Sequence, residues 1–179
     1  MYRPIRKRSE ETLADTVKVG VESGDSVGFV GAAVSSHPKI SKLASSVAEK
    51  GKRAALSSIM SQRVSKELAS SLSESEYKTV ALAPEAGSEE LRFRIGKRVL
   101  DEQVLSGIEK LAVEGIRNFK LYFMVGLPSE KPSDVQAIVN LVTEARTRAH
   151  KAAEGRKIVP KITLSVNPFI PKSLSLVHI

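Results

Sequence analysis

The sequence contains no cysteine and no tryptophan in its 179 residues. Without a thiol, the chain cannot form a disulfide, supply a thiolate nucleophile, or hold zinc or an iron–sulfur cluster through cysteine. Its three histidines, His37, His150 and His178, lie far apart and lack the HExxH spacing that places two metal ligands on one helix face. We therefore expect no metal site built from cysteine or histidine.

Long apolar runs and aromatic side chains are also scarce. Stretches such as 27–34 reach eight residues, far below the roughly 20 needed for a membrane-spanning helix. The basic N-terminus leads into Ser9, Glu10 and Glu11 rather than into the apolar region of a signal peptide. We therefore expect a cytoplasmic protein that does not enter a membrane.

The charge balance is strongly positive. The 28 Lys and Arg residues outnumber the 20 Asp and Glu residues, which gives a net charge of +8, whereas aromatic residues make up only 4%. Surfaces that bind single-stranded nucleic acid usually combine basic grooves with stacking rings. The charge therefore permits a nucleic-acid partner but favours a solvated basic surface.

The length and the 41% apolar content indicate one globular domain over residues 1–179. Apolar periodicity predicts strands at 27–34, 54–59, 79–83, 119–125 and 162–166. It predicts helices at 10–22, 40–48, 64–72, after Ser88, from Asp101 to Gly115 and from Pro132 onward. Alternating strands and helices are typical of parallel βαβ units, so the predicted fold class is α/β with about five strands.

The most unusual residues follow the predicted strand ends, where α/β proteins place ligand sites. Glu85 directly follows a strand, where its carboxylate is suited to accept hydrogen bonds from the hydroxyl or ammonium groups of a ligand. The alternative is a turn carboxylate paired with Arg92 or Lys97. Ser88 is suited to cap the helix that follows it. Because no P-loop and no GxGxxG follows any strand, nucleoside triphosphate hydrolysis has little support.

Three segments in order resemble radical S-adenosylmethionine (radical SAM) enzymes, and in particular the branch that often carries a cobalamin-binding domain. They are 79–92 (TVALAPEAGSEELR), 120–130 (KLYFMVGLPSE) and 166–172 (VNPFIPK). The resemblance implies a partial parallel (β/α) barrel that binds S-adenosylmethionine. It also implies a [4Fe–4S] cluster, held by a CxxxCxxC loop after the first barrel strand, that generates a 5′-deoxyadenosyl radical from the cofactor.

This chain departs from the family pattern because it has no cysteine. We therefore expect a fragment that lacks the first barrel strand and the cluster loop and is inactive alone. The cluster, and cobalamin if it is used, would belong to a longer parent whose substrate is unknown. A nucleic-acid substrate is allowed, as in the related methylthiotransferases that modify transfer RNA.

The resemblance also implies seven cofactor contacts at strand ends. They are Ser35, Arg63, Glu85, Ser88, Lys97, Met124 and Asn167. Glu85 and Ser88 match a polar pair that contacts the ribose or the methionine part of the cofactor. Lys97, with Arg63 as a second candidate, would face the methionine carboxylate.

The remaining matches are less direct. Met124 aligns with an apolar residue that packs on adenine, although plain core packing is an equal alternative, and Asn167 lies where the backbone borders the adenine edge. Ser35 ends the segment 31–35, where relatives often have Gly-Gly-Glu, so the serine or backbone carbonyls would serve there.

Two other functions stay open. One is a non-enzymatic basic α/β module that binds nucleic acid through Arg3, Arg6, Lys7 and Arg8. The other is a cysteine-free relative that binds the cofactor without radical chemistry. A missing first strand would leave one edge of the strand at 27–34 unpaired, and we therefore expect self-association through that edge.

Overall fold

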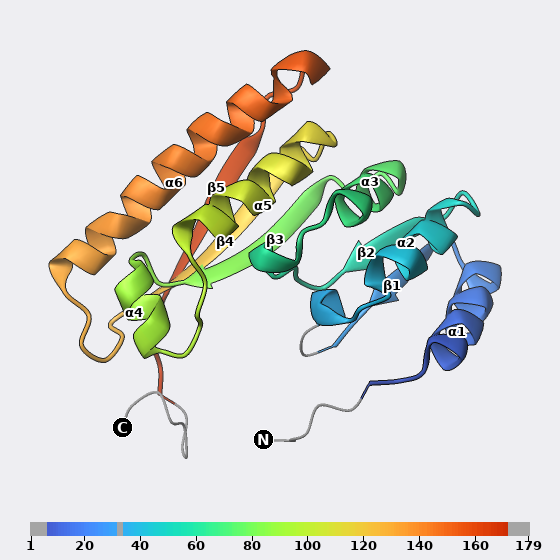
Figure 1. Cartoon of the computed structure of the whole chain (residues 1–179), viewed down its shortest axis with the longest axis horizontal. Coiled ribbons are helices and arrows are strands. Elements are labelled where there is room, and N and C mark those ends of the chain that lie inside the picture. Colours follow the sequence, from blue (N-terminus) through green and yellow to red (C-terminus); the bar gives the residue numbers. More distant parts are fainter. Residues whose placement is uncertain (1–6, 32–33, 172–179) are drawn as a thin grey trace.

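The computed structural model describes residues 7–31 and 34–171, over which helices and strands alternate (Figure 1). The helices are α1 (Glu10–Ser23), α2 (Ile40–Ala48), α3 (Lys66–Glu74), α4 (Glu89–Arg94), α5 (Asp101–Val113) and α6 (Pro132–Ala153). The strands are β1 (Ser26–Phe29), β2 (Arg53–Leu56), β3 (Thr79–Glu85), β4 (Asn118–Val125) and β5 (Lys161–Pro168). Short 3-10 helices are η1 (Val34–Ser36), η2 (Ser61–Arg63) and η3 (Glu154–Arg156).

All strand pairs among these residues are parallel. β1 pairs with β2, and β3, β4 and β5 form a three-stranded sheet in that order. A single parallel bridge between Ile59 and Leu82 links the two sheets. In Figure 1 the strands follow one another in chain order from β1 to β5, as in a barrel wall, without the order reversal of a doubly wound sheet. The predicted α/β fold is thus confirmed, and a partial barrel is consistent with this order.

Alternation along the strands divides the sheet into two faces. On β4, Phe119, Leu121 and Phe123 are fully buried in one core with residues of α5 and α6, including Ile108 and Leu141. The intervening side chains of β4 point to the opposite face and are only half-buried. We call this opposite face of β3, β4 and β5 the open face.

Serine side chains start three of the helices, because a serine hydroxyl satisfies a backbone N–H that lacks a partner within the helix. Ser9, Ser65 and Ser88 accept hydrogen bonds from the third following backbone N–H of α1, α3 and α4. The predicted caps at Ser9 and Ser88 are confirmed. Pro132 begins α6, as predicted. A backbone N–H in the first turn has no partner within the helix, so the N–H that proline lacks is not missed there.

The strand predicted at 27–34 is shorter than expected. β1 ends at Phe29, and Val34 begins η1 instead of ending a strand. The reason lies in its partner, because β2 has four residues and each of them pairs with one residue of β1. Conversely, β3 extends past the predicted end at 83 to Glu85.

No helix in the described part of the chain combines the length and the apolar character needed to cross a membrane.

Candidate functional site

The carboxyl ends of three neighbouring strands border a cavity of about 350 Å³. It is lined by Glu85 from β3, Met124 from β4, Phe169 after β5, and Ile95, Gly96 and Lys97 from the loop between α4 and α5. One wall is therefore charged and the other apolar. Cavities of this size, with few polar groups in an apolar surround, are typical of small-molecule sites.

Glu85 and Lys97 form the charged wall. Lys97 Nζ lies 3.1 Å from Glu85 Oε1, and the two side chains are 29% and 28% exposed. The predicted pairing of Glu85 with Lys97 is therefore present, whereas Arg92 pairs with Asp101. Because both charged groups remain partly accessible, the pair presents an anion and a cation to the cavity.

The backbone at Glu85 adopts an unusual conformation. Its φ is +75°, a left-handed value that is uncommon for residues other than glycine. The register of β3 against β4 also shifts here, since the step from Leu82 to Glu85 matches the step from Leu121 to Phe123. Such a bulge redirects a side chain at a strand end. It accompanies the placement of the Glu85 carboxylate in the cavity wall.

Arg92 holds the turn that follows Glu85. Its side chain is completely buried, and its Nη1 donates to the carbonyls of Ala86 at 3.1 Å and Gly87 at 2.8 Å. Its Nε donates to the Val99 carbonyl at 2.8 Å, and its Nη2 pairs with Asp101. One guanidinium group thus ties the β3–α4 turn to the start of α5.

A second network ties the same turn to α6. The Ser88 hydroxyl accepts from Leu91 N at 3.1 Å and donates to Asp134 Oδ1 at 2.5 Å. The other carboxylate oxygen of Asp134 accepts from Lys131 N at 2.8 Å. The Ser88 hydroxyl, followed by the Lys131 N–H, lowers the pKa of Asp134. This hydroxyl already has two partners inside the protein, Leu91 N and Asp134 Oδ1. The predicted contact of Ser88 with the cofactor stays a prediction.

The other predicted site residues lie at differing distances from the cavity. Met124 lines it, and Asn167 is paired with Met124 across β4 and β5 but is exposed and donates to the Ser165 hydroxyl at 3.4 Å. Ser35 is buried and its hydroxyl accepts from Met60 N at 2.9 Å. Arg63 is exposed at the end of η2. The structure thus brings Glu85, Lys97 and Met124 together and leaves Ser35 and Arg63 outside the cavity lining.

Sequence reasoning missed four lining or anchoring residues. They are Ile95, Gly96, Phe169 and Asp134. Phe169 lies inside the segment 166–172, one of the three that carry the family resemblance, so the sequence did hold a signal for this residue. Asp134 carried only the signal of an acid in the first turn of a helix, because its contact with Ser88 joins residues 46 apart along the chain.

A metal or iron–sulfur group does not match the residues present. Within residues 7–31 and 34–171, no three His, Cys, Asp or Glu side chains are grouped so as to hold a metal ion. The whole chain contains no cysteine. The basic N-terminal residues Lys7 and Arg8 are exposed, while Arg3 and Arg6 lie outside the described residues.

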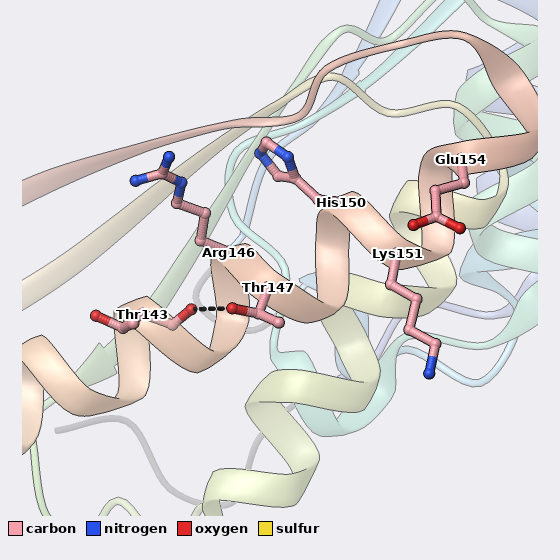
Figure 2. Close-up of a pocket in the computed structure, with 6 residues that line it drawn as sticks. All are labelled: Thr143, Arg146, Thr147, His150, Lys151 and Glu154. Atoms are coloured by element: carbon pink, nitrogen blue, oxygen red, sulfur yellow. Dashed lines mark hydrogen bonds between the residues drawn. The ribbon is translucent and has the colours of Figure 1, made fainter.

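A second cavity, of about 500 Å³, lies along the C-terminal half of α6 (Figure 2). All six of its lining residues come from α6 and the start of η3, and the labelled Arg146 and Lys151 give it a basic character. His150 Nε2 lies 3.1 Å from the carbonyl of Pro160, the residue before β5. This cavity is therefore at the amino end of β5, away from the strand ends that carry Glu85.

Comparison of the sequence with known proteins identifies a superfamily and a relative. A family model described as the radical SAM superfamily matches residues 1–142. An uncharacterized protein of Methanocaldococcus jannaschii, MJ0966, is 30% identical over 174 residues, which cover 96% of this chain and 36% of that protein.

A solved structure shows the same fold. Coproporphyrinogen III oxidase (HemN) from Escherichia coli, a radical SAM enzyme, is similar with a TM-score of 0.61 at 10% sequence identity. The match covers 89% of this chain and 36% of that one. The chain thus spans about a third of the length of each of these two proteins.

Proposed function

Because the chain belongs to the radical SAM superfamily, we propose that it is the S-adenosylmethionine-binding portion of a radical SAM iron–sulfur enzyme. The observation that carries this proposal is the Glu85–Lys97 pair set beside apolar side chains in a cavity at the strand ends. The parent enzyme would act on a substrate that the family does not specify.

The charged wall suits the methionine part of the cofactor. That part is a zwitterion, with an ammonium group and a carboxylate on one carbon. The Glu85 carboxylate would accept hydrogen bonds from the ammonium group, and the Lys97 ammonium would donate to the carboxylate. A lysine makes such a contact as a point charge, without the two-pronged geometry of arginine.

The apolar wall suits the adenine ring. Met124 and Phe169 offer a polarizable thioether and an aromatic ring, both of which pack favourably on a flat heterocycle. Asn167, which is paired with Met124 in the sheet, would then border the edge of the ring.

The iron–sulfur cluster of the family would be held outside this chain, since no residue here supplies a thiolate. We therefore propose that the chain is a fragment, and that the cluster, with cobalamin if it is used, belongs to a longer parent. The match to 36% of each relative supports this. Two apolar residues of β5 support it too. Leu164 and Val166 stand beside the buried Leu121 and Phe123 of β4, on the face that packs against the helices, yet they are 45% and 48% exposed. By itself the chain would bind the cofactor without cleaving it.

Equilibrium dialysis with labelled S-adenosylmethionine tests the proposal on the chain as it stands. Glu85→Gln and Lys97→Met should each weaken binding about 10- to 100-fold, because each removes a charge-assisted hydrogen bond worth about 1.5–3 kcal/mol. Glu90→Gln is the matched control, since it removes an exposed carboxylate paired with Arg94 on α4. Thermal melting verifies that each variant is folded.

Two results would contradict the proposal. One is no saturable binding of S-adenosylmethionine by the folded chain. The other is equal weakening by Glu90→Gln and Glu85→Gln. RNA or DNA affinity that falls steeply with salt, without cofactor binding, would instead favour the nucleic-acid module, because counterion release makes such affinity salt-dependent.

A further inference from the structure

Lys120 is a charged residue in the middle of β4 that pairs with no acid in the described part of the chain. Its side chain is half-buried on the open face, and its Nζ lies 4.9 Å from the centre of the Tyr122 ring. Within residues 7–31 and 34–171 it makes no side-chain hydrogen bond and no ion pair. A half-buried ammonium in contact with a ring alone has unused donors, which is the state expected of a group that binds an external anion.

The neighbours of Lys120 leave both space and further donors for such an anion. In the register of the sheet, Lys120 stands between Ala81 of β3 and Thr163 of β5, and Tyr122 stands beside Ser165. Ala81 has a small side chain, whereas Thr163 and Ser165 offer hydroxyl groups on the same face. The open face around Lys120 thus offers hydroxyl groups beside the ammonium.

Other charges on this face do not oppose an anion. Along β3, β4 and β5 the same face carries Lys161, which is exposed, and Glu85 follows at the strand end beyond the register shift. Glu85 is paired with Lys97 at the strand end. The field in the middle of the face is therefore positive, and charge complementarity selects an anionic ligand.

The position of Lys120 relates it to the cofactor cavity. Its contact with the ring places the ammonium beside Tyr122, two residues before Met124 on the same face. A strand rises about 3.3 Å per residue, so the positions of Tyr122 and Met124 lie about 7 Å apart along β4. A small molecule anchored at Lys120 therefore reaches the cavity at the strand ends.

We propose that the open face around Lys120 binds the anionic group of the substrate, a carboxylate or a phosphate, and so presents the rest of the substrate to the cofactor cavity. This inference rests on the proposed function, because the cavity beside Met124 is taken to hold S-adenosylmethionine. Lys120 supplies the charge, Tyr122 fixes the direction of the ammonium, and the hydroxyl groups of Thr163 and Ser165 complete the contacts. The substrate class is accordingly an organic anion.

Nuclear magnetic resonance titration of the chain tests this with simple anions. Inorganic phosphate and acetate are added separately at constant pH and ionic strength, and the ring signals of Tyr122 are followed. Saturable shifts are expected for at least one anion. Stronger binding of phosphate points to a phosphorylated substrate, and equal or stronger binding of acetate points to a carboxylate.

Variants separate a specific site from general charge. Lys120→Met should weaken the anion at least tenfold, and Lys120→Arg should restore most of the affinity because the cation is kept. Lys18→Met, which removes an exposed lysine of α1 outside the sheet, should change nothing. Equal affinity in Lys120→Met and the unaltered chain would overturn the inference, as would equal losses in Lys120→Met and Lys18→Met.

The same titrations keep the two proposals apart. Glu85→Gln should impair the binding of S-adenosylmethionine and leave the anion titration unchanged, whereas Lys120→Met should do the reverse. If the cofactor does not bind but the anion still depends on Lys120, the proposed function fails and the anion site stands. If the cofactor binds and the anion is insensitive to Lys120, the anion site alone fails.

Discussion

Replacing Arg92 by methionine is expected to destabilise the turn that carries Glu85. The guanidinium is fully buried and donates to the carbonyls of Ala86, Gly87 and Val99. Methionine fills much of the same space but donates nothing. The three carbonyls then lose their shared donor in the interior of the protein.

The size of the effect follows from those bonds. A buried polar group left without a partner costs about 1–3 kcal/mol, so three carbonyls give a loss of about 3 kcal/mol even at the low end of that range. Asp101, the ionic partner, is 49% exposed and regains water, so it adds little. In a domain of this length, 1 kcal/mol shifts the melting temperature by about 2–4 °C, which predicts a fall of about 6–12 °C.

Circular dichroism melts and urea titrations of Arg92→Met measure this directly. Arg94→Met is the matched control, because Arg94 lies on the same helix, is exposed, and forms an ion pair with Glu90 one turn away. Such an exposed pair contributes about 0.3–0.5 kcal/mol. If the two variants melt within 2 °C of each other, the turn does not depend on Arg92 and the reasoning is refuted.

Three further outcomes are expected. Gly87→Ala should lower stability by about 1–3 kcal/mol, because its Cβ would lie 2.5 Å from Ile138 N on α6, whereas Gly155→Ala meets no atom within 4 Å and should stay within about 0.5 kcal/mol in the same urea titration. Asp134 has a pKa below its ordinary value of 3.8, mainly through the Ser88 hydroxyl, so its stabilising effect is present above that pH and is lost as the pH falls through the lowered pKa. The stability gap between the unaltered chain and Asp134→Asn should therefore shrink between pH 5 and pH 2, and a constant gap would contradict this. The outer edge of β1 has no partner among the described residues, so light scattering at high concentration should show a mass above that of the monomer, which a strictly monomeric mass would disprove.

The elements that the sequence predicted well depend on local signals. Ser9, Ser88 and Pro132 mark helix starts through hydrogen bonds or backbone angles that involve three or four neighbouring residues. The apolar alternation around Phe119–Phe123 likewise follows from one strand with one buried face. Such signals need no knowledge of the rest of the fold.

What the sequence could not predict depends on distant partners. The end of β1 at Phe29 is decided by the length of β2, more than twenty residues later. In the sequence Arg92 is one of two possible partners for Glu85, and its complete burial depends on the folded turn and on the carbonyls of Ala86, Gly87 and Val99. Lys97 was paired with Glu85 in one of the alternatives, but the sequence could not choose between Lys97 and Arg92, because both follow Glu85 at a reachable distance.

The backbone of Glu85 bears on the proposed cofactor site at this strand end. A left-handed φ costs a residue with a Cβ about 1–2 kcal/mol, and a glycine would avoid that cost. The conformation persists because the turn beyond it is held from two sides, by Arg92 on the Ala86 and Gly87 carbonyls and by Asp134 on Ser88. Neither network uses the Glu85 carboxylate, whose partner Lys97 is itself partly exposed. These contacts therefore do not require a carboxylate at position 85, and the proposed cofactor site gives that carboxylate a role that glycine would not fill.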